Sequence, residues 1–500
     1  MAKNFLRFHD ISFSYENSPV ELFNNISFHA ANGWSGIIGV NGSGKSTLMM
    51  LACGLLKANA GKIDRPVKSI YCEQRTDEIP ETYSLLLNSN TKNAIKLIEM
   101  LGLQNDWIDR WDTLSHGERK RAQIASALFD EPELLAIDEP TNHLDINAKE
   151  QIAAALKIYR GIGLLVSHDR ELVDMLCNQC IFIEPPNVSV RPGGITEGLK
   201  ARQMEDQHTS KQYDEKLKAF NKLNKELLRR KEKADAAKKK SSKRNISRKD
   251  HDAKSKIDLG RLTGKDATAG RLKKRMDGRI NTAKNELASI NVKREYQTGI
   301  WLPGSISKRN TLINIPSGTL TLAEKKILAF PDLIVSPTDR IGITGINGSG
   351  KSSLIRELLK SVNAEKEHIT YIPQEICADE SKEIIKNVKQ LPNEKLGHLM
   401  IVITRLGSDP KRVLDTDYPS PGETRKLLLG LGMLKLPYII IMDEPTNHMD
   451  ITSITCLEDA LVDCPCALLL VSHDHRFLKS QINIEWNIEM KNELEFVLHI

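Results

Sequence analysis

The chain has 500 residues, 40% of them hydrophobic, which is enough for two or three globular domains with cores of their own. Its formal net charge is +6, but residues 200–300 carry 30 basic and 14 acidic side chains, a net +16, which leaves −10 for the rest of the chain. This distribution excludes a uniformly basic protein and predicts a polyanionic partner that meets the basic segment alone.

The ends and the apolar stretches of the sequence give no sign of a membrane. The N-terminal sequence MAKNFLRFHDISFSY lacks the charged-then-apolar pattern of a signal peptide, and the most apolar stretch, residues 427–442, is interrupted by Lys435 and Pro437. Eight cysteines, with one CxxC and one CxC, fit neither a disulfide framework nor a four-ligand zinc site. These features predict a cytoplasmic protein with reduced thiols and no membrane partner.

Three sequence motifs occur twice, about 305 residues apart. A duplicated set of motifs in the same order indicates a duplicated domain. We therefore predict one copy in residues 1–192, a second in residues 301–500, and a basic segment, residues 193–300, between them. The repeated motifs are GVNGSGKST (39–47) with GINGSGKSS (345–353), AIDEPTNHLD (136–145) with IMDEPTNHMD (441–450), and LLVSHD (164–169) with LLVSHD (469–474).

The first motif has the pattern G-x-x-x-x-G-K-[ST], preceded by an apolar run and followed by a helix-compatible one in both copies. In this context the glycines let backbone N–H groups turn towards nucleotide phosphates, the lysine adds a cation, and the next hydroxyl reaches Mg²⁺. The motif therefore predicts ATP as ligand in both copies. The predicted residues are Gly39, Asn41, Gly42, Gly44, Lys45, Ser46 and Thr47, and Gly345, Asn347, Gly348, Gly350, Lys351, Ser352 and Ser353.

An apolar strand that ends in two acids follows in each copy, LLAIDEP and YIIIMDEP. The first acid, Asp138 or Asp443, is predicted to hold Mg²⁺ together with Ser46 or Ser352. The second acid, Glu139 or Glu444, comes one residue later and is predicted to be the catalytic base that polarises the attacking water.

Between these motifs lie LSHGERKR (114–121) and PSPGETRK (419–426), and with them the chain resembles the ATP-binding cassette (ABC) family. The resemblance implies an α/β fold with two tandem nucleotide-binding domains that close head to tail, each ATP lying between the phosphate loop of one copy and the signature of the other. By position it implies the signature residues Ser115, Gly117, Ser420 and Gly422, the ATP- and Mg²⁺-binding glutamines Gln74 and Gln374, the D-loop residues Asp145 and Asp450, and the catalytic switch histidines His168 and His473.

The two copies depart from the family pattern in ways that predict two competent but unequal sites. His116 and Pro421 replace the first glycine of the signature, and a proline removes a backbone donor near the γ-phosphate. Tyr15 stands where the family has an adenine-stacking aromatic residue, whereas the second copy has no evident counterpart.

The segment between the copies contains no proline over residues 193–302, which favours helix over a flexible linker. Apolar residues recur at heptad-like spacing in two stretches, which predicts a helical hairpin. The polar segment 241–270 is its predicted tip, with Lys243, Arg244, Arg248 and Lys249 as candidate RNA contacts. The heptad residues are Tyr213, Leu217, Phe220 and Leu227, then Met276, Ile280, Ala283, Leu287 and Ile290.

Two cassettes and a long basic helical linker in one chain resemble the ABC-F subfamily, whose members bind the ribosome. The resemblance implies a monomer whose domains pair with each other, and a linker that reaches ribosomal RNA of the large subunit and the peptidyl-tRNA near the peptidyl-transferase centre. The segments from Gln74 to Ser115 and from Gln374 to Ser420 are similarly short, so the arm insertion of housekeeping members is expected to be absent, and the chain ends soon after His473. This pattern resembles the antibiotic-resistance, ribosome-protection branch.

Three alternatives remain open at this stage. The first is a translation factor that acts on stalled ribosomes without a drug. The second is the ATPase of a membrane transporter, although a basic hairpin has no use there. The third is a DNA-associated ATPase, although the segment is short for such a coiled coil and no groove-reading module is evident.

Overall fold

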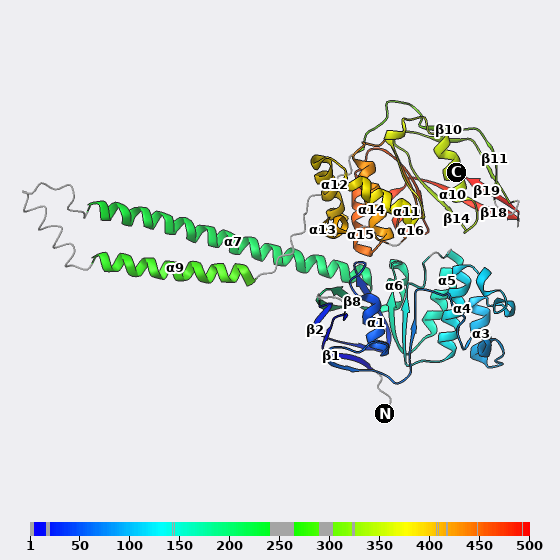
Figure 1. Cartoon of the computed structure of the whole chain (residues 1–500), viewed down its shortest axis with the longest axis horizontal. Helices are drawn as coiled ribbons and strands as arrows, with labels where there is room; N and C mark the ends of the chain where they lie inside the picture. Colours follow the sequence, from blue (N-terminus) through cyan, green and yellow to red (C-terminus); the bar gives the residue numbers. More distant parts are fainter. Residues whose placement is uncertain are drawn as a thin grey trace, which may run out of the picture. The chain divides into compact units, whose positions relative to one another are not determined.

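The computed structural model describes residues 5–16, 21–142, 144, 146–240, 265–289, 304–322, 326–406, 408, 410–416, 419–447, 449–492 and 494–500. The chain divides into two compact units, one formed by residues 1–198 and 297–500 and the other by residues 199–296. The first unit contains both sequence copies, each folded as an α/β cassette, and the second contains most of the helical segment (Figure 1). The predicted fold class is confirmed.

The central sheet of the first cassette has the strand order β5-β6-β7-β3-β8-β9, in which only the pair β8–β9 is antiparallel. Strands β6 and β7 are buried along their whole length, as expected for parallel strands covered on both faces. A second, antiparallel sheet has the order β2-β1-β4. The strands are β1 (Phe5–Phe13), β2 (Phe23–Ala31), β3 (Gly33–Gly39), β4 (Ala60–Asp64), β5 (Ser69–Cys72), β6 (Leu134–Asp138), β7 (Ile162–Val166), β8 (Cys177–Glu184) and β9 (Asn187–Pro192).

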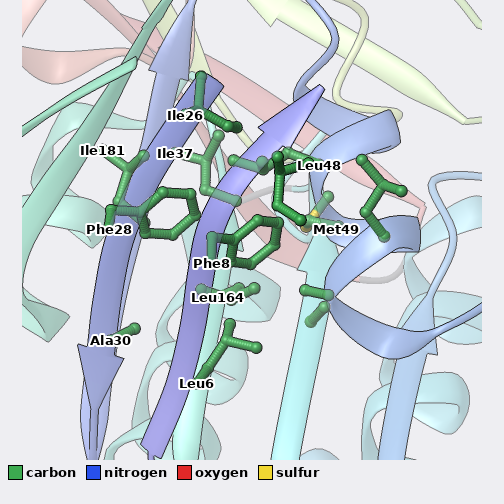
Figure 2. Close-up of a cluster of buried hydrophobic side chains, with 14 of the residues drawn as sticks. Leu6, Phe8, Ile26, Phe28, Ala30, Ile37, Leu48, Met49, Leu164 and Ile181 are labelled. Carbon is green, nitrogen blue, oxygen red and sulfur yellow. The ribbon is translucent and has the colours of Figure 1, made fainter. Parts of the chain in front are cut away.

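The main core of the first cassette lies where its two sheets and its first helix meet (Figure 2). Phe8 of β1 stacks on Phe28 of β2 with ring centroids 4.4 Å apart. Ile37 of β3 and Leu48 of the first helix belong to the same buried cluster. Because β3 runs directly into the phosphate loop, this core anchors the loop on both sides.

The helices of the first cassette follow the order expected for alternating strands and helices. Short 3₁₀ turns cover Asn105–Trp107 and Trp111–Thr113. The helices are α1 (Lys45–Cys53), α2 (Tyr83–Leu87), α3 (Lys92–Leu101), α4 (His116–Phe129), α5 (Ile146–Ile158) and α6 (Arg170–Leu176).

The second cassette has a sheet of order β11-β12-β19-β18-β14-β17-β16-β15 and a separate pair, β10–β13. Its strands β14 to β17 repeat the parallel arrangement of the first cassette. The strands are β10 (Ile313–Ile315), β11 (Gly318–Thr321), β12 (Ile327–Phe330), β13 (Leu333–Val335), β14 (Arg340–Gly345), β15 (Ile369–Ile372), β16 (Ile439–Asp443), β17 (Ala467–Val471), β18 (Ile484–Asn492) and β19 (Glu495–His499). The helices are α10 (Lys351–Lys360), α11 (Ala378–Lys389), α12 (Asn393–Arg405), α13 (Pro410–Asp415), α14 (Pro421–Met433), α15 (Ile451–Val462) and α16 (His475–Gln481), with a 3₁₀ turn at Lys366–His368.

The helical unit is built from two long helices, α7 (Ile195–Lys240) and α9 (Lys265–Ser289). Lys216 of α7 and Glu286 of α9 form an ion pair of 3.3 Å, which ties the two helices together. Met276, predicted to lie on the seam of α9, is 2% exposed. The start of α9 overlaps the last residues of the predicted tip, because Ala267 and Ala269 favour helix there. The candidate RNA contacts, residues 243–249, lie outside the described residues.

No helix in the described part of the chain is both long and apolar enough to span a membrane.

Candidate nucleotide-binding sites

Each phosphate loop is shaped by glycines in backbone conformations that other residues rarely adopt. Gly42 and Gly44 have φ angles of 78° and 93°, and Gly348 and Gly350 have φ angles of 78° and 96°. Gly44 and Gly350 are also the N-caps of α1 and α10, so the first N–H groups of both helices belong to the loop. Such N–H groups bind phosphate. Both loops therefore have the backbone conformation of an anion-binding loop at the predicted positions.

The lysine of each loop is held by a carbonyl group at the start of that loop. Lys45 Nζ donates to the Gly39 oxygen over 2.9 Å, and Lys351 Nζ donates to the Gly345 oxygen over 2.8 Å. The ammonium group thus lies across the loop in both cassettes. A cation in this place stabilises the outer phosphates of a bound nucleotide.

The predicted Mg²⁺ ligands lie in contact with each other. Ser46 Oγ donates to Asp138 Oδ2 over 2.6 Å, and the Tyr71 hydroxyl donates to the same oxygen over 3.1 Å. In the second cassette burial raises the pKa of Asp443, while a hydrogen bond from Ser352 acts against this. Asp443 Oδ1 is buried and has no hydrogen-bond partner in the described part of the chain. Because Mg²⁺ prefers oxygen ligands, both hydroxyl–carboxylate pairs fit this ion.

The two predicted catalytic bases have strained backbones and perturbed acidity. Glu139 and Glu444 follow β6 and β16 with φ angles of 47° and 49°, a costly conformation for a residue with a side chain. Burial raises the pKa of Glu139 to about 8 and that of Glu444 to about 7. Carboxyl groups with such pKa values are suited to accept a proton near neutral pH.

Each glutamate is bonded to the predicted switch histidine of its own cassette. The backbone N–H of His168 donates to Glu139 Oε2, and that of His473 donates to Glu444 Oε2, both over 3.2 Å. His473 Nε2 also donates to Asn347 Oδ1 in the phosphate loop over 2.9 Å. Burial lowers the pKa of His473 to about 3, so its ring is neutral at neutral pH. The neutral ring of His473 thus contacts the phosphate loop through one hydrogen bond that it donates to Asn347.

A cavity of about 380 Å³ lies over the second phosphate loop. Its volume falls in the range of about 300–1,000 Å³ that is common for small-molecule sites. Among the described residues, those that line it all belong to the second cassette, so the signature residues Ser115 and Gly117 are not among them. The lining is Leu322, Asn347, Gly348, Gly350, Lys351, Ser352, Ser353, Gln374, Asp443, Glu444, Asn447 and His473. Gln74, the first-cassette counterpart of Gln374, is exposed.

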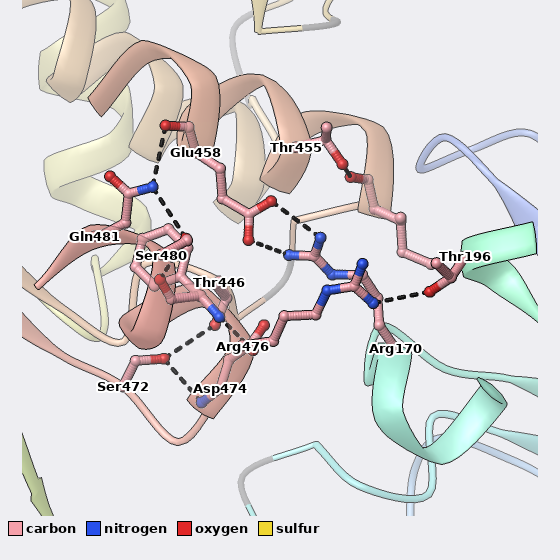
Figure 3. Close-up of polar contacts among 12 residues, drawn as sticks. Arg170, Thr196, Thr446, Thr455, Glu458, Ser472, Asp474, Arg476, Ser480 and Gln481 are labelled. Atoms are coloured by element: carbon pink, nitrogen blue, oxygen red, sulfur yellow. Dashed lines mark hydrogen bonds and ion pairs between the residues drawn. The ribbon is translucent and has the colours of Figure 1, made fainter. Parts of the chain in front are cut away.

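The cassettes contact each other near these sites. Arg170 of α6 forms a two-point ion pair with Glu458 of α15 (Figure 3). Burial lowers the pKa of Lys45, while the carboxylates of Glu139 and, from the second cassette, Asp450 raise it. The carboxylate of the second D-loop thus acts electrostatically on the lysine of the first phosphate loop. Asp145, the D-loop residue of the first cassette, lies outside the described residues.

A second cavity, of about 340 Å³, lies between the cassettes. Both switch histidines, His168 and His473, line it together with Glu444 and Lys149. Residues of the two predicted catalytic centres therefore line one cavity at the interface.

A family model described as ABC transporter matches residues 23–142 and 331–447, one match in each cassette. The chain is similar to the ribosome protection protein VmlR of Bacillus subtilis (strain 168), with 27% identity over 94% of this chain and 84% of VmlR. It is also similar to the ATP-binding protein Uup of Buchnera aphidicola subsp. Schizaphis graminum (strain Sg), with 27% identity over 90% of this chain and 75% of that protein. The chain belongs to the ABC-F subfamily.

The same fold is found among solved structures. The RNase-L Inhibitor superposes with a TM-score of 0.61 and 18% sequence identity, covering 98% of this chain and 90% of that one. The ABC-F cassettes are thus ATP-binding domains, and the chain is an ATPase. ATP is its nucleotide, and Mg²⁺ is the ion that such domains use with it.

The signature segments of this ABC-F protein begin α4 and α14. Ser115 and Ser420 are the N-caps, and each closes a capping box with Glu118 or Glu423 three residues later. Pro421 is the first residue of α14, a position that favours proline because its N–H is not needed within the helix. Proline therefore stabilises the N-terminus of α14. It also leaves that N-terminus, which carries the signature, with one backbone donor fewer.

Tyr15 lies beside the first phosphate loop of the ABC-F protein. Its hydroxyl and Thr47 Oγ1 share a hydrogen bond of 2.8 Å, and its ring meets Phe13 edge-on with centroids 5.0 Å apart. The side chain is 45% exposed. The ring is therefore held near the loop and still has surface available to a ligand.

One buried basic residue in each cassette was not predicted from the sequence. Lys120 of α4 donates to the Asp138 carbonyl over 3.1 Å and to the Glu73 carbonyl over 2.6 Å. Arg425 occupies the equivalent position in α14 and donates to the Glu444 carbonyl over 3.1 Å. Each residue ties its signature helix to the strand end that carries the acids. The signal was present, because a basic residue occupies the same place in LSHGERKR and PSPGETRK.

Proposed function

We propose that this ABC-F protein binds the ribosome when ATP closes its cassettes, inserts its linker near the peptidyl-transferase centre, and confers antibiotic resistance by ribosome protection. The observation that carries the proposal is the presence of two paired cassettes and a long helical hairpin in one chain. It is supported by the similarity to VmlR, whose name describes a ribosome protection protein, over 94% of this chain. The proposal places the protein in the cytoplasm as a monomer.

The linker has the length and charge that this role requires. Helix α7 has 46 residues, which correspond to about 69 Å at 1.5 Å per residue. The net charge of +16 on residues 200–300 suits a partner rich in phosphate. The proposed contacts are ribosomal RNA of the large subunit and peptidyl-tRNA, met by Lys243, Arg244, Arg248 and Lys249.

We assign two composite ATP sites to the pair of cassettes. Site one combines the first phosphate loop with the second signature, and site two combines the second loop with the first signature. The action of Asp450 on Lys45 supports this head-to-tail pairing. Site one contains Lys45, Ser46, Gln74, Asp138, Glu139 and His168 with Ser420 and Gly422. Site two contains Lys351, Ser352, Gln374, Asp443, Glu444 and His473 with Ser115 and Gly117.

The side chains of each site have complementary tasks in hydrolysis. Glu139 or Glu444 accepts a proton from the attacking water while the water oxygen bonds to the γ-phosphorus and the bond to the ADP oxygen breaks. The switch histidine donates a hydrogen bond to an oxygen of the departing phosphate. The serine and aspartate of each site, with Gln74 or Gln374, would hold Mg²⁺, which would supply positive charge to the phosphates.

The ATP-bound state is expected to be the ribosome-binding state. ATP favours the closed pair of cassettes because some of its contacts form only when the pair is closed. Replacing Glu139 and Glu444 with Gln keeps ATP binding and stops hydrolysis. We expect this variant to cosediment with ribosomes when ATP is added. If the variant binds ATP normally but stays in the supernatant, the ribosome is not its partner.

The RNA contacts are tested by salt. Replacing Lys243, Arg244, Arg248 and Lys249 with Ala should weaken ribosome binding and flatten its dependence on salt concentration, because each lost phosphate contact lowers the slope by about 1. Four lysines of the cassette surface changed to Ala are the matched control. An unchanged slope would assign the contacts to other residues.

The alternative function is that of a translation factor that acts on stalled ribosomes without a drug. Growth of cells with the active chain and with the hydrolysis-deficient chain separates the two. Resistance to drugs of the peptidyl-transferase centre, with normal growth in their absence, supports ribosome protection. A growth defect that is independent of drugs supports the translation factor.

A further inference from the structure

Arg476 joins the second cassette to the helix that begins the hairpin (Figure 3). It lies in the first turn of α16, and its Nη1 donates to Thr196 Oγ1 over 2.9 Å. The same nitrogen is 3.5 Å from Asp174 Oδ2. Asp174 belongs to α6 of the first cassette, and Thr196 is the second residue of α7. One guanidinium group therefore contacts both the first cassette and the root of the hairpin.

Asp174 fixes the first turn of α7. Its Oδ1 accepts the backbone N–H of Thr196 over 2.9 Å, and its Oδ2 accepts the Thr196 hydroxyl. A carboxylate at a helix N-terminus stabilises the first turn. The chain can approach this closely because residue 194 is glycine, where a Cβ would lie 2.4 Å from Asp174 Oδ1. Asp174 thus holds the first turn of α7 against α6.

The other end of this set of contacts is the second nucleotide site. His473, three residues before Arg476, is bonded to Glu444 and to Asn347 of the phosphate loop. Between them Asp474 caps α16 by accepting a backbone N–H of its first turn. His473 and Arg476 are therefore linked through the capped start of α16.

A second contact holds α6 against the second cassette. Arg170 is 5% exposed in its side chain and bonds Glu458 of α15 at two points. In the alignment of the two cassettes, His475 corresponds to Arg170 and Ala153 corresponds to Glu458. An alanine forms no ion pair, so this contact has no counterpart between the equivalent residues. The Arg170–Glu458 ion pair therefore joins the same two cassette faces as the Arg476–Asp174 contact.

The charges around Arg476 are also reversed at the equivalent positions. Glu171 stands where the second cassette has Arg476, and Lys479 stands where the first cassette has Asp174. Both residues are exposed. Helix α7 follows β9 of the first cassette directly. Its first turn therefore meets Arg476 of the second cassette and not the equivalent residue, Glu171, which belongs to the first.

We propose that Arg476 is a positioning residue that transmits the state of site two to the first turn of α7, so that the hairpin responds to site two more than to site one. The distance of 3.5 Å to Asp174 is at the limit of a hydrogen bond, so a shift of about 1 Å forms or breaks it. The inference rests on the proposed function for the use that the hairpin makes of this signal.

The experiment uses the full chain without ribosomes. The parent carries Glu139→Gln and Glu444→Gln, and hydrogen–deuterium exchange of the amides in the first turns of α7 is measured with and without ATP. Lys45→Ala blocks site one, and Lys351→Ala blocks site two. We expect ATP to change exchange by about fivefold or more, the lower end of allosteric couplings, in the parent and in the Lys45→Ala variant. The Lys351→Ala variant should show no such change.

Arg476→Ala should abolish the response although ATP still binds at site two. Lys479→Ala is the matched control, because it removes the same charge from an exposed position of the same helix, and it should respond like the parent. Thr196→Val removes the acceptor of the Arg476 bond from the other side and should give the same loss. The double variant Arg476→Ala with Thr196→Val should then lose no more than either single one.

A response in Arg476→Ala equal to that of the parent overturns the proposal. So does an equal loss of response in Lys45→Ala and Lys351→Ala, because the two sites would then act alike. The ribosome-binding proposal is tested separately by cosedimentation. An exchange response without cosedimentation would reject the ribosome and keep the coupling.

Discussion

Arg170 and Glu458, 288 residues apart in the sequence, form a two-point ion pair between the cassettes, with 3.0 Å between Nη1 and Oε2. Their side chains are only 5% and 14% exposed. A pair buried to this degree adds little net stability, because both charges lose their hydration. It does select one arrangement of the interface, because any other arrangement leaves a charge buried without its partner.

Breaking this pair from one side should cost more than removing it entirely. Arg170→Ala leaves Glu458 uncompensated and should lower the free energy of unfolding by about 3–5 kcal/mol. The double variant Arg170→Ala with Glu458→Ala should be more stable than that single variant. Urea unfolding followed by tryptophan fluorescence measures the four proteins of the cycle. Additive losses would show that the two side chains do not interact.

The buried glutamates predict how stability depends on pH in the nucleotide-free protein. The pKa of Glu139 is raised to about 8 and that of Glu444 to about 7, from 4.5. Between pH 4.5 and these values the folded protein therefore binds more protons than the unfolded chain, and stability falls as pH rises. Gln at both positions removes this loss.

The wild type should thus lose stability relative to the double Gln variant as pH rises from 4.5 to about 8, as measured by urea unfolding at each pH. Gln in place of an exposed acid, Glu489, is the control and should leave the slope unchanged. Parallel curves for the wild type and the double Gln variant would contradict the raised pKa values.

Tyr15 should contribute to ATP affinity at site one through its ring. Tyr15→Ala loses stacking worth about 1–3 kcal/mol, which corresponds to roughly 5–150-fold weaker binding. Tyr15→Phe keeps the ring and loses only the hydrogen bond to Thr47, so its affinity should stay within a few fold of the wild type. Titration with a fluorescent ATP analogue, with Lys351→Ala to silence site two, measures both. Equal losses for Ala and Phe would assign the effect to the hydroxyl.

Pro421 should slow ATP turnover at site one. Pro421→Gly restores a backbone N–H at the start of α14, so hydrolysis should rise several fold in a Glu444→Gln background, in which only site one is active. The same change should lower stability by about 0.4–1 kcal/mol, because glycine gives the unfolded chain more freedom. Released phosphate is the readout. His116→Gly, with Glu139→Gln in place, is the matched change at site two, where a donor is already present and little gain is expected.

Several features could be predicted from the sequence because contiguous residues determine them. The phosphate loops need glycines at φ angles near 80–95°, and GVNGSGKST and GINGSGKSS supply them whatever surrounds them. Local apolar runs followed by two acids predict the strand ends that carry Asp138 and Asp443. Apolar periodicity and the absence of proline predict the two long helices that flank the basic tip.

The tertiary structure alone decided which distant side chains meet. Lys120 and Arg425 reach carbonyl groups 18 to 47 residues away, and Arg476 reaches Thr196 across 280 residues. No local pattern marks such partners, because a long side chain can pair with any group that the packing of helices and sheets brings within about 3 Å. The repeated motifs thus determined that this protein has two nucleotide-binding cassettes. The packing of those cassettes determined which of them contacts the root of the hairpin.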